Sequence, residues 1–294
     1  RWYNFGLALK KFNIKTTILA SSYFHKYVSQ PKVQKLVTKE FINQIEYIWI
    51  KTKNYKKGGF NQVLNQIEFI IKSLLIIKKV FLYKPKTIIA SSPHPLVIFP
   101  AFIFSRITSA KLIFESRDLW PEILFELKVL KKYNPYYWLL KFSESFAVFV
   151  SDYVFSVKKG EYQYYKKHYN LKKSKFFYLA NSYFHEEYFE EDISREIREF
   201  SEKVLNSKKF ILSYVGALST YYNIESILEL AEKSKKDNLN VLFLIVGDGE
   251  IFNYLKQKIR ELDLDNINLL GKLKRSDAHQ ILRISNAGYV SLKD

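Results

Sequence analysis

Residues 210–249, FILSYVGALSTYYNIESILELAEKSKKDNLNVLFLIVGDG, alternate between two kinds of apolar pattern. The runs 210–216 and 241–247 are short, almost continuously apolar and end in glycine, as buried strands of parallel sheets do. Between them, apolar residues recur at the three- and four-residue steps of an amphipathic helix: Ile224, Ile227, Leu228 and Ala231. This strand–helix–strand order predicts two parallel strands joined by a right-handed crossover.

The same alternation extends in both directions along the chain. Toward the carboxyl end, strands are predicted over 267–270 and 287–292, after a helix marked by Ile251, Leu255, Ile259 and Leu262. Toward the amino end, helices are predicted over 60–75 and 135–150, and strands over four runs: 14–20, 87–91, 111–115 and 153–157. We therefore expect an α/β protein with two Rossmann-like domains built on parallel sheets.

A change in composition separates the two series. Residues 186–207 are acidic and then mixed in charge, with few large apolar side chains. We predict an amino-terminal domain over 1–185, a linker with a surface helix over 186–208, and a carboxyl-terminal domain over 209–294. Because ligands of such sheets bind at the carboxyl ends of the strands, two facing domains would form a cleft between them.

Composition limits the remaining possibilities. Hydrophobic residues make up 48% of the chain and charged residues 26%, which is ordinary for a globular protein. There is no cysteine, which excludes disulfides, thiolate chemistry and sulfur-based metal sites, and fits an intracellular protein. The chain also lacks methionine and opens at Arg1 within a predicted helix. We expect a fragment with both domains incomplete, and a processed chain is the alternative.

The net charge of +18 is unevenly distributed. Residues 1–185 hold 31 basic and 10 acidic residues, a net charge of +21, whereas the remainder holds 16 and 19, a net charge of −3. A basic domain beside a nearly neutral one favours an anionic partner, such as anionic lipid, a lipid diphosphate or nucleic acid. A solvated lysine-rich surface is the alternative. The longest uncharged run, 87–105, contains three prolines, so we predict two elements and a turn there and no membrane span.

The most distinctive motif is Arg117-Asp118-Leu119-Trp120-Pro121-Glu122, directly after the predicted strand 111–115. An arginine at a strand end can hold a phosphate or carboxylate through two hydrogen bonds. A neighbouring carboxylate can take a proton from an attacking hydroxyl. The alternative is a structural ion pair between Arg117 and Asp118, with Trp120 packed on the core.

Three further strand ends carry candidate ligand-binding residues. Gly247-Asp248-Gly249 and Gly216-Ala217 offer backbone amides near helix starts, although most such turns have no ligand. Ser92 and His94 follow the strand 87–91, where His94 could donate to a phosphate or move a proton, or be inert. His25 is in a similar position. No spacing of a first-row metal site and no phosphate-binding Gly-rich loop with Lys-Ser or Lys-Thr occurs.

In order and spacing these segments resemble GT-B glycosyltransferases of family 4, and most closely the branch for bacterial surface polysaccharides that includes N-acetyl-L-fucosamine transferases. The motif 117–122 matches that branch without change, and it is the most specific similarity. Weaker similarities are Ala20-Ser21-Ser22-Tyr23-Phe24-His25, Ala180-Asn181-Ser182 in place of Pro-Asn-Gly, and segments 214–216, 245–249 and 269–271.

This resemblance implies a sugar transferase of hexosyl or N-acetylhexosaminyl type, retaining and independent of metal. The second domain would bind the nucleotide-sugar, UDP-linked, and the first would bind a lipid-linked or saccharide acceptor at the cytoplasmic face of the plasma membrane. Arg117, Asp118 and His94 would be catalytic. The other expected contacts to substrate are Ser92, Glu122, Asn181, Gly216, Ala217, Gly247, Asp248 and Gly249.

The chain departs from the family pattern in three places. Residues 217–224 lack the expected Arg or Lys that would neutralise the diphosphate. The family's first strand would precede Arg1, and its donor-binding glutamates would follow Asp294, so we expect no turnover by the chain as given.

Two other classes remain as alternatives. One is a non-catalytic or other nucleotide-binding two-domain α/β protein, such as an epimerase or dehydrogenase, although no strand is followed by G-x-G-x-x-G. The other is a basic nucleic-acid-binding protein, although no helix-turn-helix, zinc-finger or RNP pattern is present. We expect no nucleic-acid partner.

Overall fold

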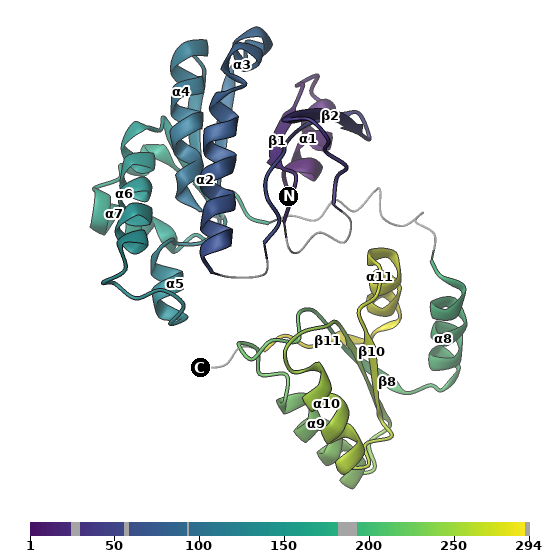
Figure 1. Cartoon of the computed structure of the whole chain (residues 1–294). Coiled ribbons are helices and arrows are strands. Elements are labelled where there is room, and N and C mark those ends of the chain that lie inside the picture. The colour runs from purple at the N-terminus through teal and green to yellow at the C-terminus, as the bar shows by residue number, and fades with distance from the viewer. Residues whose placement is uncertain (25–29, 56–58, 93, 182–192, 292–294) are drawn as a thin grey trace. The chain divides into compact units, whose positions relative to one another are not determined.

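The computed structural model describes residues 1–24, 30–55, 59–92, 94–181 and 193–291. It divides into two compact units, Arg1–Tyr183 and Phe184–Asp294, which are described separately below (Figure 1). Both units consist of strands that alternate with helices. We call them unit 1 and unit 2.

Unit 1 contains a four-stranded sheet in the order β4-β5-β6-β7, with all neighbouring strands parallel. Its strands are β4 (Thr87–Ser91), β5 (Lys111–Ser116), β6 (Tyr153–Ser156) and β7 (Phe176–Tyr178). The central strand β5 is buried from Leu112 onward, as its continuous apolar sequence predicts for a strand covered on both faces. The parallel order brings the carboxyl ends of all four strands to one edge.

Unit 1 also contains a second, mixed sheet, so the prediction that all sheets are parallel is wrong. It has the order β1-β3-β2, with β1 (Thr17–Ser21) parallel to β3 (Ile45–Ile50) and β2 (Val37–Ile42) antiparallel to it. The residues between β2 and β3, Asn43 and Gln44, both have positive φ, as in a type I′ turn. Glycine usually takes the second of these positions, so the Asn-Gln pair gave no hairpin signal.

The helices of unit 1 cover these sheets. Among them, α2, α4 and α6 lie side by side, with α4 in contact with both neighbours (Figure 1). No helix in the described ranges is both long enough and apolar enough to cross a bilayer. The helices are α1 (Trp2–Lys10), α2 (Phe60–Leu74), α3 (Ile77–Tyr83), α4 (Ile98–Thr108), α5 (Glu122–Glu126), α6 (Pro135–Val150) and α7 (Glu161–Tyr169), with short 3₁₀ turns at Pro95–Val97 and Lys173–Lys175.

Unit 2 is a parallel sheet with helices on both faces. Its strand order is β10-β9-β8-β11, and every pair is parallel. One face is covered by a core that includes residues of α9 and α10, and the other by a core that includes residues of α8 and α11. The elements are α8 (Arg195–Asn206), β8 (Phe210–Val215), α9 (Ser226–Lys236), β9 (Val241–Val246), α10 (Phe252–Glu261), β10 (Ile267–Gly271), α11 (Arg275–Ile284) and β11 (Ala287–Gly288).

The helix predicted within 186–208 is α8, and it packs into unit 2. Ile197 and Val204 on its apolar side are buried against β8, β9 and α11. Ser194, just before the helix, donates through its backbone and its hydroxyl to Asp277 of α11, at 2.8 Å in both cases. These contacts assign the helix to unit 2, while residues 182–192 of the predicted linker lie outside the described residues.

Candidate functional site

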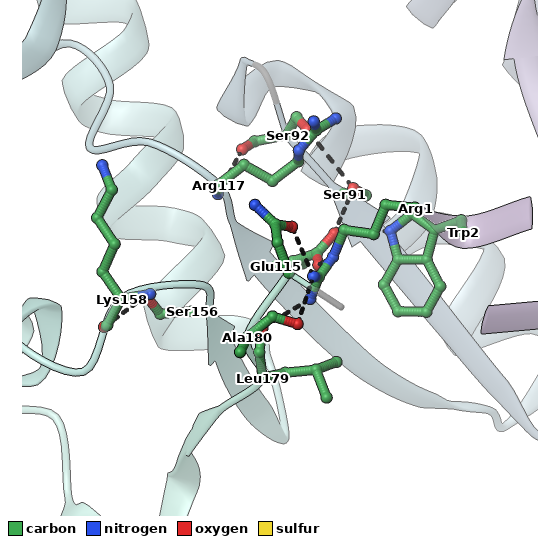
Figure 2. Close-up of polar contacts among 11 residues, drawn as sticks. Arg1, Trp2, Ser91, Ser92, Glu115, Arg117, Ser156, Lys158, Leu179 and Ala180 are labelled. Atoms are coloured by element: carbon green, nitrogen blue, oxygen red, sulfur yellow. Dashed lines mark hydrogen bonds and ion pairs between the residues drawn. The ribbon is translucent and has the colours of Figure 1, made fainter. Parts of the chain in front are cut away.

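The first candidate site is the edge of unit 1 where β4, β5, β6 and β7 end. Polar residues gather at this edge, as expected for parallel strands whose carboxyl ends coincide (Figure 2). Ser91 and Ser92 come from the end of β4, Glu115 to Asp118 from β5, Ser156 and Lys158 from β6, and Leu179 to Asn181 from the segment after β7.

Glu115 is the buried centre of this edge. Its carboxylate accepts hydrogen bonds from Arg1 Nε and Trp2 Nε1, both at 2.6 Å, and from Ser91 Oγ at 2.5 Å. The Glu115 side chain is inaccessible to solvent, so these three donors replace the water that an ionised carboxylate would otherwise need.

Arg1 extends this cluster to the segment after β7 (Figure 2). Its Nη1 donates to Ala180 O at 2.9 Å and to Asn181 Oδ1 at 2.7 Å, and its Nη2 donates to Leu179 O at 2.8 Å. One guanidinium therefore joins β5 to the predicted substrate-binding residue Asn181. Sequence reasoning missed Arg1 and Glu115 as a pair, because 114 positions separate them and neither belongs to a shared motif.

Arg117 and Asp118 lie at the same edge but have different surroundings. The backbone N–H of Arg117 donates to Ser92 Oγ at 3.0 Å, which links two predicted site residues. The Arg117 side chain is exposed, and it has no hydrogen-bond or ion-pair partner in the part of the chain that the structure describes. Asp118 pairs with Lys158 Nζ at 3.2 Å, and about half of each side chain is exposed.

The predicted alternative for this motif was a structural pair between Arg117 and Asp118. Among the described residues the two side chains do not form an ion pair with each other, so that part of the alternative is wrong. Its second part agrees with the structure, because Trp120 packs against a buried cluster that includes Tyr137 and Leu140. The exposed Arg117 guanidinium and the half-exposed Asp118 carboxylate are both accessible to a ligand.

His94 is less accessible than its position at a strand end indicates. The residue is 8% exposed, and its Nδ1 has no hydrogen-bond partner within the described ranges. Burial lowers the pKa of His94 to about 4, because the charged imidazolium would lose its hydration. The ring is therefore neutral near pH 7 and offers no positive charge to a phosphate. Its predicted role in proton transfer stays a prediction.

Glu122 belongs to a polar network between α5, α6 and α7. Its carboxylate accepts from Lys141 Nζ at 2.6 Å, Tyr137 OH at 3.0 Å and Tyr164 OH at 3.3 Å. Burial raises the pKa of Glu122, but the hydrogen bond and charge of Lys141, together with the hydrogen bonds from Tyr137 and Tyr164, outweigh burial and lower it. Lys141 also reaches the buried Glu144 at 3.4 Å. These partners give Glu122 a structural function, and substrate binding by Glu122 stays a prediction.

The second candidate site is the edge of unit 2 where β8, β9 and β10 end. Gly216 N donates to Val246 O at 3.0 Å, and Gly247 N donates to Gly271 O at 2.8 Å. Leu218 N donates to Asp248 O at 3.0 Å. The loops that carry Gly216, Ala217, Gly247, Asp248 and Gly249 are thus in direct contact, as the sequence predicts for adjacent parallel strands.

Glycine is required at this edge because the neighbouring loops approach closely, which the sequence did not indicate. A Cβ on Gly247 would lie 1.8 Å from Gly216 O, and a Cβ on Gly249 would lie 2.2 Å from Leu218 O. Both residues also have positive φ, at 148° and 158°. Their missing side chains make room for the neighbouring loop.

Two polar groups complete this edge. Asp248 Oδ1 accepts from the N–H of Gly249 at 2.8 Å, which fixes the carboxylate against its own loop. Lys272 directly follows Gly271, is exposed, and has no hydrogen-bond or ion-pair partner among the described residues. Lys272 is therefore a cation next to the glycine loops. The sequence analysis expected the residue that neutralises the diphosphate only within 217–224, so it missed Lys272.

The described parts of the chain contain no group of three or more His, Asp or Glu side chains arranged to hold a metal ion. The prediction of a metal-independent reaction is not tested by this. His25, Pro93 and Ser182, which belong to predicted motifs, lie outside the described residues.

Comparison with known proteins agrees with this geometry. Residues 196–291 match the family described as Glycosyl transferases group 1, and this range extends from α8 to beyond β11. No curated protein matches the sequence significantly.

Solved structures with the same architecture include an E. coli trehalose-6-phosphate structure with bound UDP-2-fluoro glucose. It has a TM-score of 0.62 and 11% identity, and the match covers 98% of this chain and 74% of that one. WaaG, a glycosyltransferase involved in lipopolysaccharide biosynthesis, has a TM-score of 0.54 and 12% identity, with 84% and 63% covered. Anabaena HepE in complex with UDP has a TM-score of 0.54 and 13% identity, with 81% and 60% covered.

The chain therefore has the GT-B fold, with two Rossmann-like domains, and this prediction is confirmed. The chain spans about 60% of the length of HepE. At these identities the similarity establishes the fold, while the specific family 4 branch stays a prediction.

Proposed function

We propose that this protein is a glycosyltransferase that moves a sugar from a nucleotide-sugar to an acceptor. The observation that carries the proposal is the match of residues 196–291 to Glycosyl transferases group 1. That range contains every glycine loop of the unit 2 edge. The family match therefore covers the same residues that form the unit 2 edge, where the glycine loops contact one another.

The donor is UDP-linked and binds at the edge of unit 2. Support comes from two similar structures, HepE with UDP and the E. coli structure with UDP-2-fluoro glucose. The glycine loops at the ends of β8 and β9 pack directly against each other, which holds their backbone in place at this edge. Lys272 supplies a positive charge next to them that can offset the charge of a diphosphate.

The acceptor binds at the edge of unit 1. Arg117, with its free guanidinium, contacts the diphosphate or an acceptor phosphate. The acceptor oxygen bonds to the anomeric carbon while the bond from that carbon to the diphosphate oxygen breaks. UDP leaves with the bonding electrons, and Asp118 orients the acceptor hydroxyl and takes its proton.

The finer features follow from the resemblance and the charge distribution. We propose a hexosyl or N-acetylhexosaminyl transfer, retaining and without metal, to a lipid-linked acceptor in bacterial surface polysaccharide synthesis. The net charge of +21 over residues 1–185 supports a position at the anionic cytoplasmic face of the plasma membrane.

Calorimetric titration with UDP tests the donor site. The wild-type chain is expected to bind UDP, and Lys272→Ala to bind it about tenfold more weakly, because a charge-assisted contact is lost. Lys256→Ala is the matched control, since Lys256 is equally exposed but lies on α10. Absence of UDP binding, or equal weakening by both variants, would contradict the assignment.

No observation favours the two alternative classes. Another nucleotide-binding α/β protein would bind UDP without transferring sugar, and a nucleic-acid-binding protein would keep its DNA in the presence of anionic lipid. Salt-sensitive retention on DNA that vesicles do not displace would support the second alternative.

A further inference from the structure

The helix layer of unit 1 has very few charges. The adjacent helices α2, α4 and α6 contain 42 residues, of which five are charged: Glu68, Lys72, Arg106, Lys141 and Glu144. Four of these five are engaged in the ion pairs Lys72–Glu68 and Lys141–Glu144. The four helices of unit 2 have 18 charged residues among 43. Since both units are α/β, the fold does not explain this difference.

Helix α2 buries polar residues and exposes a row of apolar ones, while Phe69, Ile70 and Leu74 pack against the core of unit 1. Its buried positions are Asn65, Gln66 and Ser73. A row at steps of three and four residues is exposed along the whole helix and its carboxyl cap, and it begins with Phe60, which is 74% exposed. The row consists of Phe60, Leu64, Ile67, Ile71 and Leu75.

Helix α6 has an exposed aromatic row of the same kind. Trp138 is 61% exposed, Phe142 is also exposed, and Phe149 is 83% exposed. Their spacings of four and seven residues place the three side chains on one side of the helix. Phe142 stacks on Phe99 of α4, with ring centroids 6.4 Å apart, so the apolar surface is continuous between the two helices.

Exposed lysines lie on elements next to this helix layer. Lys128, Lys131 and Lys132 lie between α5 and α6, and Lys78 and Lys79 lie on α3, which contacts α4. The Lys132 ammonium lies 4.5 Å from the ring centre of Phe125. Apolar and aromatic residues bordered by lysines are typical of surfaces that insert into the interface of an anionic bilayer.

We infer that the outer surface of α2, α4 and α6 is a docking face for an anionic lipid bilayer. The aromatic and aliphatic rows enter the boundary between headgroups and acyl chains, and the lysines meet the headgroups. A second copy of this chain is a poorer occupant, because the bordering lysines of two copies would oppose each other. The inference rests on the proposed function in one respect: a transferase with a lipid-linked acceptor must work at the surface of a bilayer.

Flotation of the full chain with phosphatidylcholine vesicles containing 30% phosphatidylglycerol tests the face. We expect the double variant Phe142→Ser, Phe149→Ser to lose vesicle binding about tenfold or more, because two large apolar side chains no longer enter the interface. The pair Leu64→Ser, Ile71→Ser is expected to lose a similar amount. Leu230→Ser with Leu239→Ser is the matched control, since both leucines are exposed but belong to unit 2.

A positional measurement accompanies the flotation. Anionic vesicles should shift the tryptophan emission to shorter wavelength, and Trp138→Phe should remove most of that shift while the other three tryptophans remain. Lys131→Gln with Lys132→Gln, or high salt, should weaken binding without abolishing the apolar contribution.

Equal flotation of the wild type and both apolar double variants would overturn the inference. Self-association of the wild type that Phe142→Ser, Phe149→Ser abolishes, with flotation unchanged, would assign the face to a second copy and would also overturn it. UDP titration of the same variants separates the two proposals. If the apolar double variants lose flotation but still bind UDP, the docking face is supported. If they lose flotation and the wild type itself does not bind UDP, the docking face is supported and the proposed function is refuted.

Discussion

At the scale of single residues, the unit 1 edge combines fixed and free groups. Glu115, Arg1 and Trp2 are joined by short hydrogen bonds, and Arg1 holds Asn181. Arg117, next in the chain to this cluster, has an exposed guanidinium with no partner among the described residues. A rigid base beneath a free cation is an arrangement suited to binding an anion, because little needs to be rearranged when the ligand arrives.

Replacing Arg117 or Asp118 tests their proposed roles in the transfer reaction. In a form of the enzyme that transfers sugar, Arg117→Ala and Asp118→Asn should each lower turnover on the order of 100-fold, because the lost contacts act on charge that develops in the transition state. The free energy of unfolding should change by less than about 0.5 kcal/mol, since neither side chain is buried. Arg198→Ala, an exposed arginine of α8, is the control for both measurements. A fall in stability with turnover per folded molecule preserved would show a structural function for the motif.

His94 predicts a specific dependence of stability on pH. Its folded-state pKa of about 4 lies below the ordinary value of 6.5, so between these values the unfolded chain binds a proton that the folded chain does not. Stability from this residue is complete above pH 6.5 and is lost as pH falls toward 4, by about 1.4 kcal/mol per pH unit and about 3 kcal/mol in total. Denaturant unfolding of the wild type and of His94→Asn across this range should differ by that slope. Parallel pH profiles would show that His94 is hydrated and titrates normally.

The sequence predicted the location of several site residues at the unit 1 edge but not their interaction partners. Ser92, Arg117 and Asp118 were expected at strand ends, which meet at one edge of a parallel sheet, whereas Asn181 was expected at the site only from the family resemblance. The structure places all four residues at this edge. Their partners were not predictable, since Lys158 and Arg1 are distant in sequence from Asp118 and Asn181. Burial of His94 depends on tertiary packing, which no local pattern indicates.

At the scale of elements, the apolar runs predicted the strands of the two described parallel sheets except β7, although β11 (Ala287–Gly288) is shorter than the predicted 287–292. The predicted strand 87–91 and helix 135–150 coincide with β4 and α6. The hairpin of β2 and β3 was missed because its turn lacks glycine, and β7 because three residues are too short for a periodic signal. The missed elements therefore result from local features, a turn without glycine and a very short strand, and the overall alternation of strands and helices was predicted correctly.

The network beneath Glu122 joins three elements and predicts a stability effect. Lys141→Met should lower the free energy of unfolding by roughly 2–4 kcal/mol, because Glu122 and the buried Glu144 lose their common cation. Lys111→Met is the matched control, since its pair with Asp152 is largely exposed and should contribute less than about 1 kcal/mol. Equal effects in chemical denaturation would show that the network contributes no more than a surface ion pair.

At the scale of the whole molecule, the two units share an architecture and differ in charge and surface. Unit 2 has the family match, the glycine loops and a nearly neutral composition. Unit 1 has most of the positive charge, the apolar helix layer and the edge with Arg117. This division favours donor binding by one unit and acceptor binding by the other, and the cleft between them stays a prediction.

Hydrogen–deuterium exchange with and without UDP tests the central claim, donor binding at the glycine loops of unit 2, most directly. We predict protection of residues 216–219, 247–250 and 271–272, because bound diphosphate would cover the loops at the ends of β8, β9 and β10. Gly249→Ala should abolish that protection, since a Cβ there would clash with Leu218 O at 2.2 Å. Protection confined to other segments, or no change with saturating UDP, would contradict the claim.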